Sequence, residues 1–158
     1  MMKRIPHTVI ASLTLAVITG CGTISDRRLI DRFNENRSDF EKLVQMVGSD
    51  TNLHRIVERK VEYKPNAAPP LSSSRLDAYF SLMKKLHLSS VSAVHREPGR
   101  FSFRAKEVRF GGQGYLYSPG KPRPVVNELD GYEPDTPGSF SVYRQIEDGW
   151  YLYLSKGM

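Results

Sequence analysis

The stretch FSVYRQIEDGWYLYL, residues Phe140–Leu154, is typical of a β-hairpin and indicates what kind of fold the rest of the chain must complete. Apolar and polar side chains alternate on both sides of Asp148-Gly149, and a period of two places one set of side chains on one face of a sheet. An Asp-Gly pair between two such runs is a strong signal for a tight hairpin turn. The apolar positions expected on the covered face are Phe140, Val142, Ile146, Trp150, Leu152 and Leu154.

The segment before this hairpin is also predicted to form strands. Residues 91–110 contain two runs of alternating apolar positions, and Glu97–Arg100 between them holds the Pro and Gly that favour a turn. The apolar positions change parity within the second run, so we expect a β-bulge near Lys106. Gly111–Gly114 is interpreted as a glycine-rich turn, after which Tyr115–Tyr117 begins another strand.

A first helix is predicted near the start of the domain. Apolar residues recur at helical spacing over residues 26–47 and form one stripe. Ser25 or Asp26 is expected to cap the helix by accepting hydrogen bonds from its free N–H groups. Gly48 is expected to end it, because glycine tolerates the left-handed conformation.

A second helix is predicted from Ser74, which with Asp77 resembles a capping box, to residues 87–88. Between the helices, residues 49–64 favour a short helix that runs into an extended segment, although alternating apolar positions leave a strand open. Residues 65–70 contain three prolines and are predicted to be a loop.

Helices followed by hairpins predict an α+β domain spanning residues 26–158. We expect two main helices packed on one face of a four- to five-stranded antiparallel sheet. A chain of this length forms one ordinary domain.

The N-terminal segment carries a different signal. Lys3 and Arg4 precede an uncharged, mostly apolar run, Thr8–Gly20, which is shorter than the roughly 20 residues of a membrane-spanning helix. The run ends at Cys21, the only cysteine of the chain. Ile18–Cys21 (ITGC) resembles the lipobox of bacterial lipoproteins.

This resemblance implies cleavage of residues 1–20 as a signal peptide and acylation of Cys21, with chains such as palmitate, at the start of a tether spanning residues 21–25. Several acyl chains give stable membrane anchoring. Gly22, where an Asp would favour retention in the inner membrane, implies the outer membrane facing the periplasm. The alternatives are a buried structural cysteine or a short uncleaved anchor.

Charge gives a weaker indication of the partner. Loss of Lys3 and Arg4 with the signal lowers the net charge from +6 to +4. A mildly basic domain favours acidic partners or an anionic membrane surface, although simple solubility explains the charge equally well. Export argues against nucleic acid as the natural partner.

The sequence contains no strong motif for chemistry. His54, His87 and His95 lack metal-site spacing, and no G-x-S-x-G elbow is present. Paired loop carboxylates are consistent with acid–base chemistry if the fold holds them together, but solvated loop charges are the simpler interpretation. We therefore expect no metal, no other cofactor and no catalytic residue. The acidic residues in question are Glu128, Asp130, Glu133 and Asp135.

The side of the hairpin opposite Trp150 is predicted to be rich in tyrosine. If helices cover the Trp150 side, the tyrosines lie on the open face, where their large area and low entropy cost suit binding. The alternative is that a second layer, such as the long loop, covers them. The tyrosines assigned to this candidate binding surface are Tyr115, Tyr117, Tyr143, Tyr151 and Tyr153.

Residues 118–139 form a long loop with five prolines and three glycines. Loops of this length in compact domains are usually functional or disordered. Lys121 and Arg123 lie among prolines, followed by Val125 and Val126 as an apolar hook, and this combination suits contact with a partner.

Together these patterns favour a lipid-anchored cell-envelope protein that binds another envelope protein or a cell-wall component, which is acidic if charge steers the encounter. An immunity or inhibitor lipoprotein belongs to this class, but a lysozyme inhibitor is disfavoured because lysozyme is itself basic. The alternatives are a small envelope hydrolase that uses the loop carboxylates and a structural spacer in an envelope complex.

Overall fold

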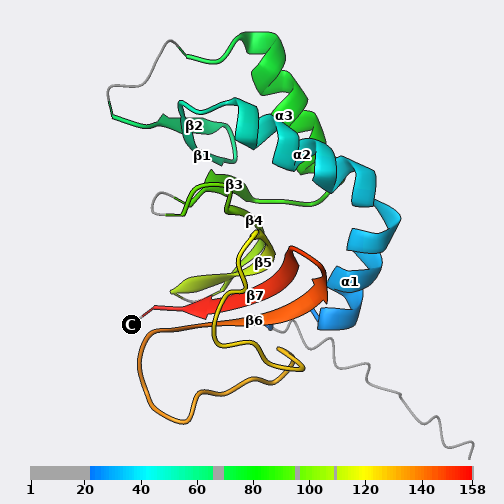
Figure 1. Ribbon diagram of the computed structural model, residues 1–158, viewed down its shortest axis with the longest axis vertical. Helices are drawn as coiled ribbons and strands as arrows, with labels where there is room; N and C mark the ends of the chain where they lie inside the picture. Colours follow the sequence, from blue (N-terminus) through cyan, green and yellow to red (C-terminus); the bar gives the residue numbers. More distant parts are fainter. Residues whose placement is uncertain (1–21, 66–69, 95–96, 109, 158) are drawn as a thin grey trace, which may run out of the picture.

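The computed structural model describes residues 22–65, 70–94, 97–108 and 110–157, which contain three helices and a seven-stranded antiparallel sheet (Figure 1). The helices are α1 (Asp26–Glu35), α2 (Arg37–Ser49) and α3 (Ser73–Lys85). The strands are β1 (Leu53–Val57), β2 (Lys60–Tyr63), β3 (Ser90–Ala93), β4 (Phe101–Val108), β5 (Gly111–Tyr117), β6 (Phe140–Glu147) and β7 (Trp150–Lys156). The strand order is β2-β1-β3-β4-β5-β7-β6. The α+β class is confirmed, while the predicted two helices and four to five strands are too few.

The single helix predicted over residues 26–47 is two helices that meet at Asn36. The backbone of Asn36 (φ −126°, ψ 25°) leaves the helical conformation, and its N–H donates to the carbonyl oxygens of Arg32 and Phe33 at 3.2 Å. Its side-chain amide also donates to the Arg32 carbonyl at 3.0 Å. Asn36 therefore caps α1, and α2 continues in a new direction along the sheet (Figure 1).

The short helix predicted within residues 49–64 is wrong, because this segment forms the hairpin β1–β2. Ile56 pairs with Val61 of β2 on one side and with Val91 of β3 on the other. Ile56 is fully buried beneath the helices. Pairing with a strand that lies over thirty residues further on decides the structure here, and a local pattern carries no information about such pairing.

Gly111–Gly114 is not a turn but the first half of β5. Its residues pair with both β4 and β7, so this glycine-rich stretch lies in the middle of the sheet. The predicted bulge is confirmed, since the β4–β5 register shifts between Arg104 and Lys106. The Asp148-Gly149 hairpin is confirmed too, with Gly149 at φ +74°.

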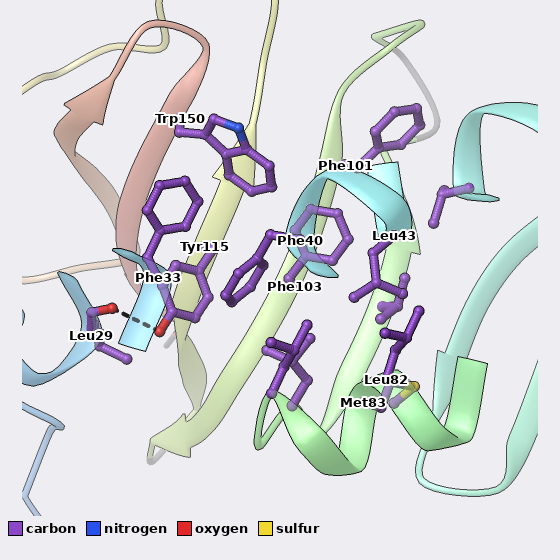
Figure 2. Close-up of a cluster of buried hydrophobic side chains, with 14 of the residues drawn as sticks. Leu29, Phe33, Phe40, Leu43, Leu82, Met83, Phe101, Phe103, Tyr115 and Trp150 are labelled. Carbon is purple, nitrogen blue, oxygen red and sulfur yellow. Dashed lines mark hydrogen bonds between the residues drawn. The ribbon is translucent and has the colours of Figure 1, made fainter. Parts of the chain in front are cut away.

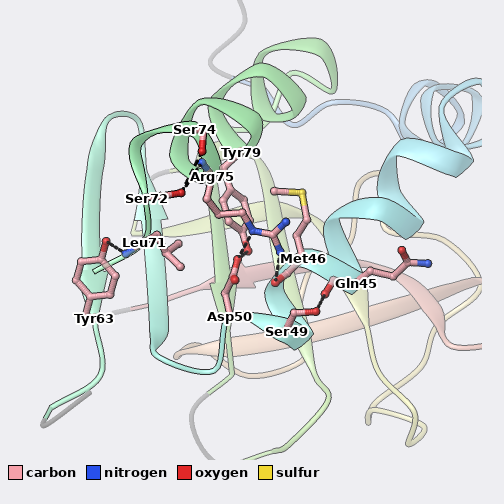
Figure 3. Close-up of polar contacts among 10 residues, drawn as sticks. All are labelled: Gln45, Met46, Ser49, Asp50, Tyr63, Leu71, Ser72, Ser74, Arg75 and Tyr79. Atoms are coloured by element: carbon pink, nitrogen blue, oxygen red, sulfur yellow. Dashed lines mark hydrogen bonds and ion pairs between the residues drawn. The ribbon is translucent and has the colours of Figure 1, made fainter. Parts of the chain in front are cut away.

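Helix α3 begins one residue before the predicted cap. The hydroxyl oxygen of Ser72 accepts a hydrogen bond from the N–H of Arg75 at 3.3 Å, so Ser72 takes the capping role assigned to Ser74. The Arg75 side chain then joins α3 to α2, because its Nε lies 2.8 Å from Asp50 Oδ2 (Figure 3). The Tyr79 hydroxyl donates to the same carboxylate oxygen at 2.8 Å.

One aromatic cluster forms the centre of the core between the helices and the sheet (Figure 2). Phe40 is fully buried, and its ring centroid lies 5.3 Å from that of Phe33 and 4.5 Å from that of Tyr115. Trp150 lies 5.0 Å from Phe33. The Tyr115 hydroxyl donates to the Leu29 carbonyl at 3.0 Å, which satisfies this buried polar group.

The buried tyrosines predict a loss of stability at alkaline pH. Burial raises the pKa of Tyr115 above its ordinary value near 10, and burial together with Asp50 raises the pKa of Tyr79. Below pH 10 both phenols are neutral in the folded and unfolded states, so their contribution is fully present. Above pH 10 the unfolded chain loses these protons first, and the free energy of unfolding falls by about 1.4 kcal/mol per pH unit for each tyrosine. Urea unfolding between pH 8 and 11.5 measures this slope, and Tyr115→Phe is expected to make it shallower. Equal slopes for the two proteins would contradict the assignment.

Candidate binding surface

The helices cover one face of the sheet. On the other face, side chains of the strands pack against one another. Arg104, Gly114, Tyr153 and Tyr143 are register partners across β4, β5, β7 and β6, and Leu116 pairs with Tyr151 in the next row. These positions alternate with Phe103, Tyr115 and Leu152 of the core. We call the surface they form the Arg–Tyr face. Its side chains are Arg100, Arg104, Leu116, Tyr143, Tyr151 and Tyr153.

The structure divides the five tyrosines predicted to share a binding surface between the two faces. Tyr143, Tyr151 and Tyr153 lie together on the Arg–Tyr face, as predicted. Placing Tyr115 and Tyr117 with them is wrong, because these two residues pair with Leu152 and Trp150 and pack in the helix-covered core. Strand β5 begins four residues before Tyr115. Its register against β7 sets the face on which Tyr115 lies, and this register was not visible in the sequence.

The Arg–Tyr face is more buried than an open tyrosine surface. Tyr151 and Tyr153 are only 3% and 7% exposed, while Tyr143 is half-buried. Arginines lie over the tyrosines: the Arg100 guanidinium is 5.5 Å from the centre of the Tyr143 ring and donates to its hydroxyl at 3.2 Å. An arginine of the sheet itself therefore covers part of the tyrosine surface. This corresponds in part to the alternative of a second layer over the tyrosines.

The Arg104 side chain occupies the space that Gly112 leaves on β5. A Cβ at Gly112 would lie 2.6 Å from Arg104 Nε, so the guanidinium stem rests on bare backbone. From there Arg104 hydrogen-bonds to Tyr153, and its Nη1 pairs with Glu107 at 2.7 Å. Burial lowers the pKa of Arg104, but the bonds to Glu107 and Tyr153 more than offset this and raise its pKa above the ordinary value.

Both arginines keep unused hydrogen-bonding capacity. Arg100 pairs with Glu97, and its side chain is 13% exposed against 26% for Arg104. The Nε atoms of Arg100 and Arg104 are buried and have no hydrogen-bond partner among the described residues. The Nε atoms do not reach a partner while they stay buried, but the exposed part of a guanidinium that stacks on tyrosine, as that of Arg100 does, suits planar acceptors such as carboxylate or amide groups.

The proline-rich loop of residues 118–139 extends this face at the edge of the sheet. Val125 forms a parallel bridge with Tyr143, and the N–H of Val126 donates to the Tyr143 carbonyl at 2.7 Å. Val125 is 36% exposed beside Tyr143, whereas Val126 packs against the main core. The two predicted loop cations, Lys121 and Arg123, are exposed.

A buried ion pair holds the middle of this loop against α1. Asp26 is 1% exposed, and its Oδ2 accepts hydrogen bonds at 2.7 Å from Arg144 Nη1 and from the N–H of Leu129. Ser25 caps α1 as predicted, since its hydroxyl accepts from the N–H of Arg28, and the Asp130 carboxylate accepts from the free N–H of Asp26 at 3.0 Å. Asp130 therefore has a structural role that the sequence did not indicate.

The four loop carboxylates considered for acid–base chemistry separate into two pairs, all of them exposed. Glu128 and Asp130 lie near the start of α1. Glu133 and Asp135 line a groove of about 630 Å³ between the loop and the strand ends. The remaining lining residues are Thr23, Val108, Tyr132, Pro134, Pro137, Phe140, Leu154 and Lys156.

The described part of the chain contains no group of three or more His, Asp or Glu side chains placed to hold a metal ion. Within the same ranges, no helix is long and apolar enough to cross a membrane. Cys21 and the predicted signal peptide lie outside the described residues. Comparison with protein-family models, with curated proteins and with solved structures found no match for this chain.

Sequence reasoning missed the two arginines that define the surface. The signal was present, because Ser102 and Arg104 alternate with Phe101 and Phe103, which were assigned to the core. Gln113, whose side chain binds the backbone of Ile24, was missed because its glycine neighbours suggested a turn. No local signal could have paired Asp26 with Arg144, since 118 positions separate them.

Proposed function

We propose that this protein is a lipid-anchored cell-envelope protein that binds another envelope protein or a cell-wall component through the Arg–Tyr face. The arginine–tyrosine contacts on the face opposite the helices, Arg100 over Tyr143 and Arg104 with Tyr153, carry this proposal. Tyrosine and arginine are enriched at the centres of interfaces, where they contribute much of the binding energy. Val125 adds an apolar contact at the rim of the same surface.

The anchor in this proposal is the acylated Cys21, with the protein at the outer membrane facing the periplasm. The basic net charge suits an acidic partner, and export argues against nucleic acid. An immunity or inhibitor lipoprotein fits the same description. If charge steers the encounter, the association rate falls as ionic strength rises.

A second candidate function is a small envelope hydrolase, because Glu133 and Asp135 share the 630 Å³ groove with Tyr132. Such a reaction needs two carboxyl groups that converge on one substrate atom. Both carboxylates are exposed, so they suit a catalytic role poorly. A binding role for the Arg–Tyr face is therefore the better supported function.

The test is in-cell crosslinking and co-purification of the native protein and of two matched tyrosine variants. Tyr143→Ala removes the half-buried tyrosine of the Arg–Tyr face, and Tyr132→Ala removes a half-buried tyrosine of the groove. We expect Tyr143→Ala to reduce recovery of the partner tenfold or more, as for an interface hot spot, and Tyr132→Ala to leave it unchanged. Circular dichroism checks that both variants fold.

Loss of the partner from Tyr132→Ala alone would move the binding site to the groove and favour the hydrolase. Full recovery by both variants would exclude both surfaces as contact sites and favour a structural spacer.

A further inference from the structure

The chain is docked onto the sheet from its first described residues. The side chain of Gln113, 1% exposed in the middle of β5, accepts from the N–H of Ile24 at 2.7 Å and donates to the Ile24 carbonyl at 2.6 Å. This side-chain amide thus satisfies both backbone groups of one residue, as a neighbouring strand would. Lys106 Nζ also donates to the Gly22 carbonyl. The described part of the predicted tether, residues 22–25, is therefore attached to the domain.

A docked tether fixes where a lipid on Cys21 would leave the domain. Cys21 is bonded directly to Gly22, and the Cα atoms of bonded residues are about 3.8 Å apart. A flexible linker would let the domain turn freely above a membrane, but here the acyl chains would emerge at the strand ends. The part of the protein around Gly22 would then be the part nearest the bilayer.

The side chains at this end suit a membrane interface. Phe110, in the turn between β4 and β5, is 61% exposed and is the most exposed large apolar side chain of the described residues. Its left-handed backbone (φ 61°) is held by a hydrogen bond from the N–H of Gly157 to its carbonyl. Lys156 pairs with Gly111 at the same strand end and is exposed.

Three acidic side chains lie near this end, and each has a basic side chain close by. Glu107 is paired with Arg104 at 2.7 Å. Glu133 and Asp135 line the groove beside Thr23, together with Lys156. An aromatic ring flanked by lysines matches the apolar and anionic layers of a lipid interface.

We propose that this strand-end surface, formed by Gly22, Lys106, Phe110 and Lys156, lies against the lipid bilayer and is held there by the docked tether. Phe110 contacts the boundary of the acyl chains, and the two lysines contact the headgroups. The strands then rise from the membrane, and the Arg–Tyr face is presented sideways to a partner. This inference rests on the lipid anchor of the proposed function.

The test uses the acylated full-length protein in vesicles of phosphatidylethanolamine and phosphatidylglycerol that contain a headgroup-spin-labelled lipid as a fluorescence quencher. Acylation consumes the only native thiol, so a single new cysteine takes the fluorophore alone. Phe110→Cys places the label in the proposed surface. Asp148→Cys, exposed in the turn at the opposite end of β7, is the matched control. At about 3.4 Å per residue, the seven residues of β7 separate the labels by roughly 20 Å or more.

We expect the label at position 110 to be quenched at least fivefold more than the label at position 148. Insertion of a six-residue Gly-Ser spacer between Cys21 and Gly22 leaves the docking of Ile24 intact, and it is expected to abolish most of this difference. A difference that survives the spacer would overturn the role of the docked tether.

Two failures are distinguishable. Equal quenching of both labels in an acylated, vesicle-bound protein would overturn the orientation while leaving the anchor in place. A chain whose mass shows no acyl group and that stays in the aqueous fraction would overturn the anchor and this inference together.

Discussion

Phe40→Ala is expected to lower the free energy of unfolding by about 4 kcal/mol. Phe40 is fully buried, and its ring lies within 6.4 Å, between centroids, of Phe33, Phe103, Tyr115 and Trp150. Truncation of a buried phenylalanine removes its transfer free energy and leaves a cavity, at a cost of about 3–5 kcal/mol. A domain of this size has a total stability of about 5–15 kcal/mol, so this variant is expected to be only marginally folded at 37 °C. Urea unfolding at 25 °C followed by circular dichroism measures the change.

Phe110→Ala is the matched control for this substitution. It removes the same ring from a side chain that is 61% exposed and lies outside the main aromatic cluster. The expected change in the free energy of unfolding is within about 0.5 kcal/mol. A similar loss for both variants would show that the aromatic cluster around Phe40 does not dominate the core.

Gly114→Ala is expected to destabilise the protein by about 3 kcal/mol or to prevent folding. A Cβ at this position would lie 2.2 Å from the carbonyl oxygen of Phe103 and 2.8 Å from the backbone nitrogen of Ala105. Both atoms belong to the backbone of β4, which cannot move aside without breaking its ladder with β5. Overpacking against flexible side chains costs about 1–3 kcal/mol, and a contact with backbone lies at the upper end or beyond. The yield of folded protein and the midpoint of thermal unfolding report the effect.

Gly120→Ala is the matched control, because it adds the same methyl group at a position where that group has space. A Cβ at Gly120 has no neighbouring atom within 4 Å. The thermal midpoint of this variant is therefore expected to stay close to that of the native protein. An unchanged thermal midpoint for Gly114→Ala as well would show that β4 and β5 do not approach closely at Gly114.

The two proposals are geometrically compatible. The strand-end surface and the Arg–Tyr face are perpendicular parts of one sheet, since one lies at the ends of β5 and β7 and the other along their length. Contact of one with lipid leaves the other free for a partner. Residues 124–126 add to β6 at the edge of the Arg–Tyr face, so the proline-rich loop lies beside the proposed partner site.

The features predicted correctly are those that depend on residues close together in the chain. The Asp148-Gly149 turn, the alternation on both sides of it, the bulge near Lys106 and the helical stripe ending near Gly48 are all written in spacings of a few residues. Each reflects a local backbone preference or a period that the chain repeats within one element. These features were enough to predict the α+β class.

The pairing of the strands, and the face that each side chain occupies, depend instead on contacts between distant segments of the chain. Gly111–Gly114 forms a strand because β4 and β7 approach closely on both sides, and bare glycine backbone permits that approach. Tyr115 lies in the core rather than on the Arg–Tyr face, because a strand that starts at Gly111 has its parity set by β7. Register between distant segments is chosen by the burial that the whole sheet achieves, and a shift of one residue exchanges the two faces. The docking of Ile24 on Gln113 and the pairing of Asp26 with Arg144 depend on the same long-range choice, so neither could be read from the sequence.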